Sequence, residues 1–567
     1  MSESISNERL SKRNLWGYSM GGIGRDMAYQ LVNTYLLTFI TFTKGLSNTE
    51  FAMVGVIMVI CRIFDGCNDP FMGSIIEITR TKIGKFKPWI LAGVFTNVAV
   101  IIALFCVPLR GTSYLIFSAF GYLLWGMTYT MNDISYWGML PSLTSNPGDR
   151  NNLTTLANIG AGIGAGLSVL AIPSLTQGNL AIASNASKSY AIVSIIVCIV
   201  FFVCQIMTVF VVKEKPLPKV RVDDGEKRSL KDMFKVIFKN DQLKPVMASM
   251  LIYNIGSCIT MALASYWIYY RFAYQGLLVT LFTVISGVST LVIVFFPMMC
   301  KKHSRRWISK LSMIMIIVGY LLMFVISLTT GINPDADKVG FKIGEVLIPV
   351  TFIFTGLTGT CAFFGQTLFY QVLTISVANT VEYNEYTTGT RDEGVIFACR
   401  PFTAKLGSAA VVGITTLVVL ALGLNPTNKA ISNADYEAGQ LAVQVEQLVK
   451  DETPNFDSLS KEEQTKLIEA KKKSIETENV AKIENIIHTN EDTKVAKWQY
   501  QTMFAFMTLL PLVILLGSFA IYFKKYNISE ERYDEICAEI AKRKLAAEGN
   551  AEVVLDGADV NELENTG

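Results

Sequence analysis

Eight charged residues lie inside long apolar stretches of this chain, where water is scarce and an unpaired charge is costly. They are Arg25, Asp26, Arg62, Asp65, Asp69, Asp133, Arg400 and Lys405. An ionisable side chain at the centre of a membrane span costs about 3 kcal/mol on insertion scales, so such residues normally face a water-filled cavity or a partner. Because four of the eight are acidic and four are basic, we expect them to converge on one cavity and to compensate one another.

The clearest pair among them is Asp65 and Asp69, in the run CRIFDGCNDPFMG. Residues four apart share one face of a helix, so the two carboxylates should lie one turn apart. Their repulsion in a low-dielectric site is relieved by a bound Na⁺ or a shared proton. We therefore predict a coupling-ion site, with both carboxylates as Na⁺ ligands and with neutral oxygens from Asn68 and Thr130. The alternative is a permanent lock of the pair by nearby basic side chains, which would be Arg62 and Lys405.

A second group of residues has the chemistry of a sugar-binding pocket. Arg25 and Asp26 are adjacent, and Asp133 is followed one helical turn later by Trp137. A carboxylate can accept two hydroxyl hydrogen bonds, a guanidinium can donate to sugar oxygens, and an indole can lie on the apolar face of a pyranose. The alternative is a salt bridge between helices, with Trp137 in the core or in an interfacial aromatic belt.

Twelve apolar runs are long enough to position these residues across a bilayer, since a spanning helix needs about 20 mostly apolar residues. The runs cover roughly 15–43, 51–75, 88–108, 113–141, 153–176, 190–212, 243–272, 276–299, 307–330, 344–375, 394–423 and 499–523. Basic residues concentrate in the connections at 80–87 and 301–310. By the positive-inside rule, these connections and both termini should be cytoplasmic.

This pattern divides the chain into six parts. We expect a six-helix half over 1–212, a cytoplasmic linker over 213–242, helices 7–11 over 243–425, a charged extracellular insertion over 426–498, the twelfth helix over 499–523, and a cytoplasmic helix with a tail over 524–567. The predicted fold is therefore an all-α membrane protein with twelve transmembrane helices in two pseudo-symmetric halves, the usual plan of a secondary transporter. The insertion, rich in Lys and Glu, should form a solvated helical hairpin or a mobile cap, and the alternative is an extracellular docking element.

Composition argues against several other classes of protein. The chain has 567 residues with 50 Lys and Arg against 47 Asp and Glu, a balance that does not favour nucleic-acid binding. Hydrophobic residues make up 51% and charged residues 17%, below the roughly 25% of soluble domains. The two histidines, His303 and His488, lie outside the apolar runs, and we find neither a nucleophile with a base nor a phosphate-binding loop. We therefore expect neither an enzyme nor a cofactor, and we assign the run Gly160, Gly162, Gly164 and Gly166 to helix packing.

Several motifs together resemble the glycoside-pentoside-hexuronide:cation symporter family of the major facilitator superfamily. They are RIFDGCNDPFMG followed by GKFKPWIL, then LLWGMTYTMNDISYW, ANTVEYNEY, and AKLGSA around Lys405. The resemblance covers nearly all twelve predicted helices, but not the insertion or the tail. It implies the major facilitator fold and alternating-access symport of a sugar with Na⁺ or H⁺.

The resemblance also implies roles for individual residues. The cation site would comprise Asp65, Asp69, Asn68 and Thr130, with Lys405 between this site and the sugar. The substrate set would comprise Arg25, Asp26, Asp133, Trp137 and Tyr370. A charge network that closes the cytoplasmic side would comprise Arg150, Glu382 and Arg391.

Two departures from the family pattern weaken the case for melibiose as the substrate. Family members that carry melibiose have an arginine where this chain has Asn158, and a glutamine where it has Arg400. Compared with those members, this chain lacks a positive charge at Asn158 and has an additional one at Arg400, on a different wall of the expected pocket. Our hypothesis is that Arg400 recognises a different sugar. That sugar would be a pentoside, or a hexuronide whose carboxylate makes a bidentate contact with the guanidinium. The alternative is an ion pair of Arg400 with Asp26 or Asp133.

We expect a monomer in the bacterial cytoplasmic membrane. Its partners would be the lipid bilayer, a small sugar and a monovalent cation, without nucleic acid. Two competing interpretations remain: a sugar sensor that does not transport, which would lack the cation site, and an exporter, which would favour an apolar cavity with few buried charges.

Overall fold

The structure is a computed structural model, and it describes residues 10–144, 146–214, 238–272, 274–332, 338–343, 346–390 and 392–543. Most of the predicted linker over 213–242, the end of the tail and Arg391 lie outside these residues. The described chain is almost entirely helical, with one two-stranded sheet.

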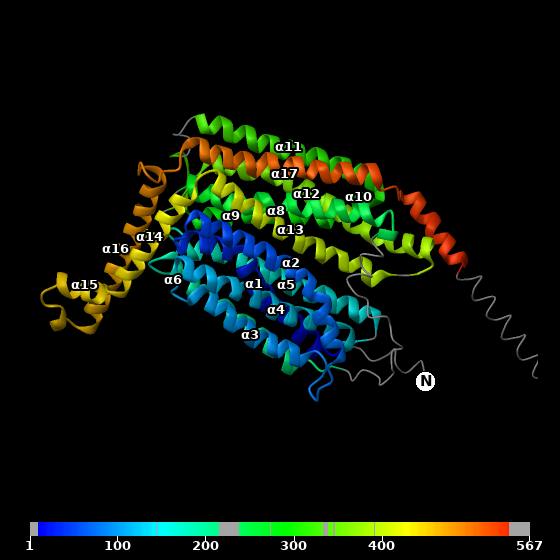
Figure 1. The fold of residues 1–567 in the computed structure, drawn as a ribbon, viewed down its shortest axis with the longest axis horizontal. Coiled ribbons are helices and arrows are strands. Elements are labelled where there is room, and N and C mark those ends of the chain that lie inside the picture. The colour runs from blue at the N-terminus through cyan, green and yellow to red at the C-terminus, as the bar shows by residue number, and fades with distance from the viewer. Residues whose placement is uncertain are drawn as a thin grey trace, which may run out of the picture.

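The first half of the chain forms six long helices that lie side by side (Figure 1). They are α1 (Lys12–Thr43), α2 (Asn48–Ile78), α3 (Lys87–Cys106), α4 (Gly111–Leu143), α5 (Pro147–Thr176) and α6 (Ala186–Val211). Local sequence sets several of the starts. Ser47 and Glu50 form a capping box at the start of α2, and Asn146 caps α5 directly before a proline.

The second half is built from α8 (Leu243–Arg271), α9 (Gly276–Val288), α10 (Val292–Lys302), α11 (Arg305–Ile332), α12 (Val350–Thr388), α13 (Glu393–Ala421) and α17 (Lys497–Lys525). A short 3₁₀ turn, Ser289–Leu291, separates α9 from α10 inside one predicted span. The predicted helical start at 344 is wrong. Antiparallel strands β1 (Gly340–Ile343) and β2 (Val346–Pro349) come first, since β-branched residues and an extended proline favour a strand there.

The two halves form adjacent layers of roughly parallel helices (Figure 1). Within the described residues, nine helical segments are long and apolar enough to cross a membrane. Large apolar side chains also point outward, among them Phe120 at 65% and Phe210 at 70% exposure, which suits a hydrocarbon surround. The chain is therefore a multi-pass membrane protein. Helices α1, α2 and α4, which carry Arg25, Asp65 and Asp133, fall outside the nine.

The glycine run in α5 shows why α1 and α5 pack closely. A Cβ added at Gly160 or Gly164 would overlap the backbone carbonyl oxygen of Ser19 or Ile23 in α1. The other two glycines of the run have open space at that position. The predicted packing role is thus confirmed for the two glycines that face α1.

The segment between α13 and α17 forms an arm at one end of the bundle (Figure 1). It contains α14 (Asn425–Val443), α15 (Val445–Glu452) and α16 (Lys461–His488). The segment is helical as predicted, but its three helices enclose a small core of their own around Val449, Phe456 and Ile475. We call this end of the bundle the arm end. The opposite end, where α1 begins and a helix over 530–543 lies, is the terminal end.

Several hydrogen bonds join the two halves near the arm end. The hydroxyls of Thr41 and Tyr266 lie 3.1 Å apart, and those of Ser174 and Thr280 lie 2.8 Å apart. The rings of Tyr266, Tyr269, Tyr270 and Tyr274 surround Phe42. The halves are therefore tightly packed on this side of the bundle.

Candidate cation and sugar site

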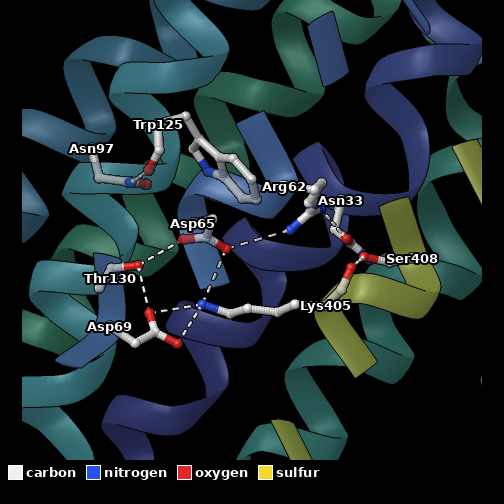
Figure 2. A network of polar contacts seen from close by, with 9 residues as sticks. All are labelled: Asn33, Arg62, Asp65, Asp69, Asn97, Trp125, Thr130, Lys405 and Ser408. Carbon is white, nitrogen blue, oxygen red and sulfur yellow. Dashed lines mark hydrogen bonds and ion pairs between the residues drawn. The ribbon is translucent and has the colours of Figure 1, made fainter. Parts of the chain in front are cut away.

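A lysine from α13 meets two carboxylates from α2 inside the bundle (Figure 2). The Nζ atom of Lys405 donates to both carboxylate oxygens of Asp69, at 2.8 and 2.7 Å, and lies 3.1 Å from Oδ2 of Asp65. The two carboxylates share one face of α2, as their spacing predicts. Because α2 belongs to the first half and α13 to the second, this charged cluster links the halves.

Thr130 of α4 adds a neutral oxygen to the cluster. Its hydroxyl lies 2.8 Å from Oδ1 of Asp65 and 3.3 Å from Oδ1 of Asp69, so α4 contacts both carboxylates (Figure 2). Asn68 is half-buried, and among the described hydrogen bonds none joins it to either carboxylate. The structure therefore brings three of the four predicted cation ligands into contact.

Arg62 is held mainly by α1 and by aromatic rings. It donates to the side-chain oxygen of Asn33, and its guanidinium lies 5.1 Å from the ring of Trp125. Its contact with Asp65 is long, at 3.9 Å. The alternative of a lock by Arg62 and Lys405 thus has one close contact and one distant one.

Solvent exposure separates the two carboxylates. The Asp65 side chain is 9% exposed, whereas that of Asp69 is 34% exposed. Asp69 is therefore the carboxylate more accessible to water, and Asp65 lies in the less polar surroundings, where electrostatic interactions are stronger.

Four of the residues predicted for sugar binding also lie together. Arg25 pairs with Asp26 at 2.6 Å and with Asp133 at 3.0 Å. Its guanidinium lies 4.8 Å from the ring of Trp137 and 4.7 Å from that of Tyr136. The salt bridge between helices that we considered as the alternative is thus present. Asp26 and Asp133 remain 21% and 34% exposed, so their oxygens are still open to a ligand's hydroxyl groups.

Helix α4 places the two clusters next to each other. Thr130 contacts the α2 carboxylates, and Asp133, three residues later, pairs with Arg25 of α1. Residues three apart are neighbours on one helix face, about 5–6 Å between Cβ atoms. The two clusters are therefore neighbours along one face of α4.

The second half contributes Arg400 and Tyr370. The Nε atom of Arg400 donates to the Tyr370 hydroxyl at 3.1 Å, and Tyr370 stacks on Tyr253. In the described part of the chain Arg400 contacts Tyr370 and is paired with neither Asp26 nor Asp133. Arg400 is exposed, so its guanidinium is accessible to a ligand.

The predicted cytoplasmic charge network is only partly described. Arg150, in the first turns of α5, donates to the Thr144 carbonyl at 3.4 Å. Glu382 lies in the last turns of α12, and Arg391 lies outside the described residues. The network therefore stays a prediction.

The aromatic lining of the site was not identified from the sequence. Tyr122 and Trp125 of α4 surround the Arg62 guanidinium, and Tyr129 stacks on Trp125. With Tyr136, these residues follow the i, i+3, i+7 spacing of one helix face. That pattern was available in the motif LLWGMTYTMNDISYW together with Tyr122, which directly precedes it.

Comparisons with known proteins agree on one class. A family model described as MFS/sugar transport protein matches residues 17–442. The raffinose carrier protein of Pediococcus pentosaceus is 26% identical over 437 residues, which cover 75% of this chain and 64% of that protein. The isoprimeverose transporter of Lactiplantibacillus pentosus is 27% identical over 414 residues, which cover 72% and 80%. The chain thus spans just under two thirds of the raffinose carrier's length.

A solved structure, a D-xylose-proton symporter, superposes with a TM-score of 0.51 at 11% identity and covers 72% of this chain and 90% of that one. At this identity the superposition establishes the fold alone, which is the major facilitator fold predicted from the sequence.

Proposed function

Because the chain belongs to the family of MFS/sugar transport proteins, we propose that it is a secondary active symporter that couples entry of Na⁺ or H⁺ to uptake of a sugar. The family match agrees with the resemblance found in the sequence motifs. The observation that carries the proposal is the cluster of Asp65, Asp69 and Lys405, which places competing charges between the two halves.

The cation step follows from this competition. A Na⁺ ion or a proton that binds Asp69 competes with the Lys405 ammonium for the same oxygens. Its binding weakens the ion pair that joins α2 to α13, and so it changes the free energy of moving one half against the other. Asp65 and Thr130 supply further oxygens for Na⁺, and protonation of Asp69 alone would have the same effect on Lys405.

The sugar step uses the neighbouring cluster. Asp26 and Asp133 accept hydroxyl hydrogen bonds, Arg25 donates to sugar oxygens, and Trp137 offers an apolar face. Since Thr130 and Asp133 lie on one face of α4, cation binding alters the position of the sugar-binding carboxylate. Coupling of this kind is reciprocal, so the sugar must tighten cation binding by the same factor.

The substrate follows from the relatives and from Arg400. Proteins named for raffinose and isoprimeverose support a glycoside or a pentoside as the class of substrate, whereas a hexuronide is proposed from Arg400 alone. Arg400 and Tyr370 form the wall that we assign to selecting among these sugars.

We further propose that the protein is a monomer in a bacterial cytoplasmic membrane and that it needs no cofactor and catalyses no reaction. The basic connections at 80–87 and 301–310 support a cytoplasmic terminal end, which leaves the arm outside. The named relatives are bacterial.

Uptake by proteoliposomes tests the proposal. Labelled raffinose, lactose and D-xylose would be supplied separately under an inward Na⁺ gradient and under an inward proton gradient. Symport requires that at least one sugar accumulates above its external concentration under one gradient, and that an ionophore abolishes the accumulation. Sugar binding with neither accumulation nor downhill uptake would support the non-transporting sensor instead.

A further inference from the structure

The start of α8 and the end of α17 lie side by side at the terminal end of the bundle (Figure 1), and a groove of about 570 Å³ runs between them. Three lysines and three apolar residues form most of its lining: Lys244, Pro245, Ala248, Ile521, Lys524 and Lys525. None of these residues belongs to the charged clusters around Lys405 and Arg25. The groove is therefore separate from the proposed transport site.

Hydrogen bonds hold the two walls of the groove together. Toward the middle of the bundle, the Ser249 hydroxyl donates to the Ser518 carbonyl at 2.9 Å, and the Ser518 hydroxyl donates to the Ser249 carbonyl at 2.7 Å. At the outer side, the backbone amide of Asn527 donates to the side-chain oxygen of Gln242 at 2.8 Å. The fold itself therefore forms the groove, as is usual for small-molecule sites.

The three lysines give the mouth of the groove a positive charge. Their side chains are exposed, and in the part of the chain that the structure describes none of them forms an ion pair. The acidic residue of the lining is Asp241, whose carboxylate accepts a hydrogen bond from the Gln242 amide at 3.0 Å. Since three positive charges face one negative charge, the groove favours an anionic ligand.

The inner part of the groove is apolar. On α8, Ala248 follows Lys244 by four residues, and on α17, Ile521 precedes Lys525 by the same interval. Because residues four apart are neighbours on one helix face, each wall has an apolar residue one turn deeper than a lysine. The same face of α17 continues inward to Val513, whose side chain is 65% exposed. The groove therefore leads from a charged mouth to an apolar surface of the kind that contacts lipid chains.

A ligand that combines a phosphate group with an apolar chain fits both parts of the groove. Ammonium groups donate charge-assisted hydrogen bonds to phosphate oxygens, and basic pockets between transmembrane helices bind anionic lipid head groups. We propose that the groove binds an anionic phospholipid, with its phosphate at the three lysines and an acyl chain along Ala248 and Ile521. A free phosphate ion would occupy only the mouth. The site requires only that α8 and α17 cross the membrane, so it does not depend on the transport proposal.

Photocrosslinking of the full chain in nanodiscs can test this site locally. The nanodiscs would consist of phosphatidylcholine with a small fraction of phosphatidylglycerol that carries a photoreactive group in its acyl chain. Photoreactive phosphatidylcholine at the same fraction measures labelling by bulk lipid, and mass spectrometry maps the labelled residues. One lysine near the membrane surface strengthens binding of an anionic lipid by about fivefold. We therefore expect phosphatidylglycerol to label 244–252 and 513–525 at least about fivefold more than phosphatidylcholine does.

Matched variants decide whether the groove is responsible. The test variant replaces its three lysines by glutamine: Lys244→Gln, Lys524→Gln and Lys525→Gln. Labelling of the two segments by phosphatidylglycerol should fall to the level of phosphatidylcholine. The control variant replaces three exposed lysines at the same end of the bundle but outside the groove: Lys301→Gln, Lys302→Gln and Lys310→Gln. It should leave the labelling unchanged. Ala248→Phe, which fills the inner part of the groove without changing its charge, should also reduce the excess labelling by phosphatidylglycerol.

The proposal is overturned if both lipids label the two segments equally, or if labelling by phosphatidylglycerol is unchanged in the test variant. An equal loss in the test and control variants would show that the charge of the whole terminal end attracts the lipid, which also overturns a site in the groove. Unlabelled phosphatidylglycerol should compete with the photoreactive lipid, whereas inorganic phosphate should not. Equal competition by inorganic phosphate would identify a site for a soluble anion instead of a lipid.

Discussion

Replacing Asp69 by asparagine would test the proposed coupling most directly. Asp69→Asn removes one negative charge but preserves the shape of the side chain and one acceptor oxygen. Lys405 and Thr130, which both contact Oδ1 of Asp69, therefore keep a hydrogen-bond partner. The fold should be maintained, while the cation loses one of its two charged ligands.

The expected loss of cation-binding free energy depends on how exposed the Asp69 side chain is. At an effective dielectric constant of about 20, two unit charges about 3 Å apart interact by roughly 5–6 kcal/mol. Measured losses on removing one partner of a buried pair are smaller, about 2–5 kcal/mol. Because Asp69 is 34% exposed, the lower part of that range applies. A loss of about 2–3 kcal/mol weakens cation binding by about 30- to 150-fold.

The assay compares accumulation with exchange in proteoliposomes. We expect Asp69→Asn to reduce the ratio of internal to external sugar to about one under the gradient that drives the unmodified protein. Exchange of labelled for unlabelled sugar, which needs no gradient, should persist. Asp492→Asn, the same substitution at an exposed position beyond α16, is the matched control and should accumulate sugar normally.

One result would refute this reasoning. If Asp69→Asn accumulates sugar to the level of the unmodified protein under the same gradient, the α2 carboxylates do not carry the coupling ion. Their contacts with Lys405 would then be the permanent lock considered as the alternative.

Three further predictions concern specificity, packing and pH. Arg400→Gln should change the ranking of sugars in competition uptake by at least tenfold for one of them, and an unchanged ranking would remove Arg400 from substrate selection. Gly164→Ala should destabilise the protein by about 1–3 kcal/mol because its Cβ meets α1 backbone, whereas Gly166→Ala, in open space, should be neutral in thermal unfolding. Burial raises the pKa of Asp435 from its ordinary 3.8 to about 6. The folded protein thus keeps a proton that the unfolded chain loses, and stability should fall by up to about 3 kcal/mol as the pH rises from about 4 to 6. Asp435→Asn should remove this slope, and an unchanged slope would show that another group causes it.

The sequence alone determined the helices and the chemistry that they carry. Apolar runs of sufficient length can satisfy their backbone groups in lipid only as helices, so their positions were readable. Within one helix the geometry is fixed by spacing, which is why the four-residue interval between Asp65 and Asp69 was enough to assign both carboxylates to one face. The exception was 346–349, where β-branched residues and a proline favour a strand over an extended helix.

Only the tertiary structure decided which charges meet. Lys405 lies 336 residues beyond Asp69 in the chain, and their contact depends on the packing of α13 against α2. Packing likewise directed Arg400 toward Tyr370 rather than toward Asp26 or Asp133, and it docked the arm through Asp435. Such contacts depend on how whole helices are placed, and the spacing of residues within each helix leaves that placement open.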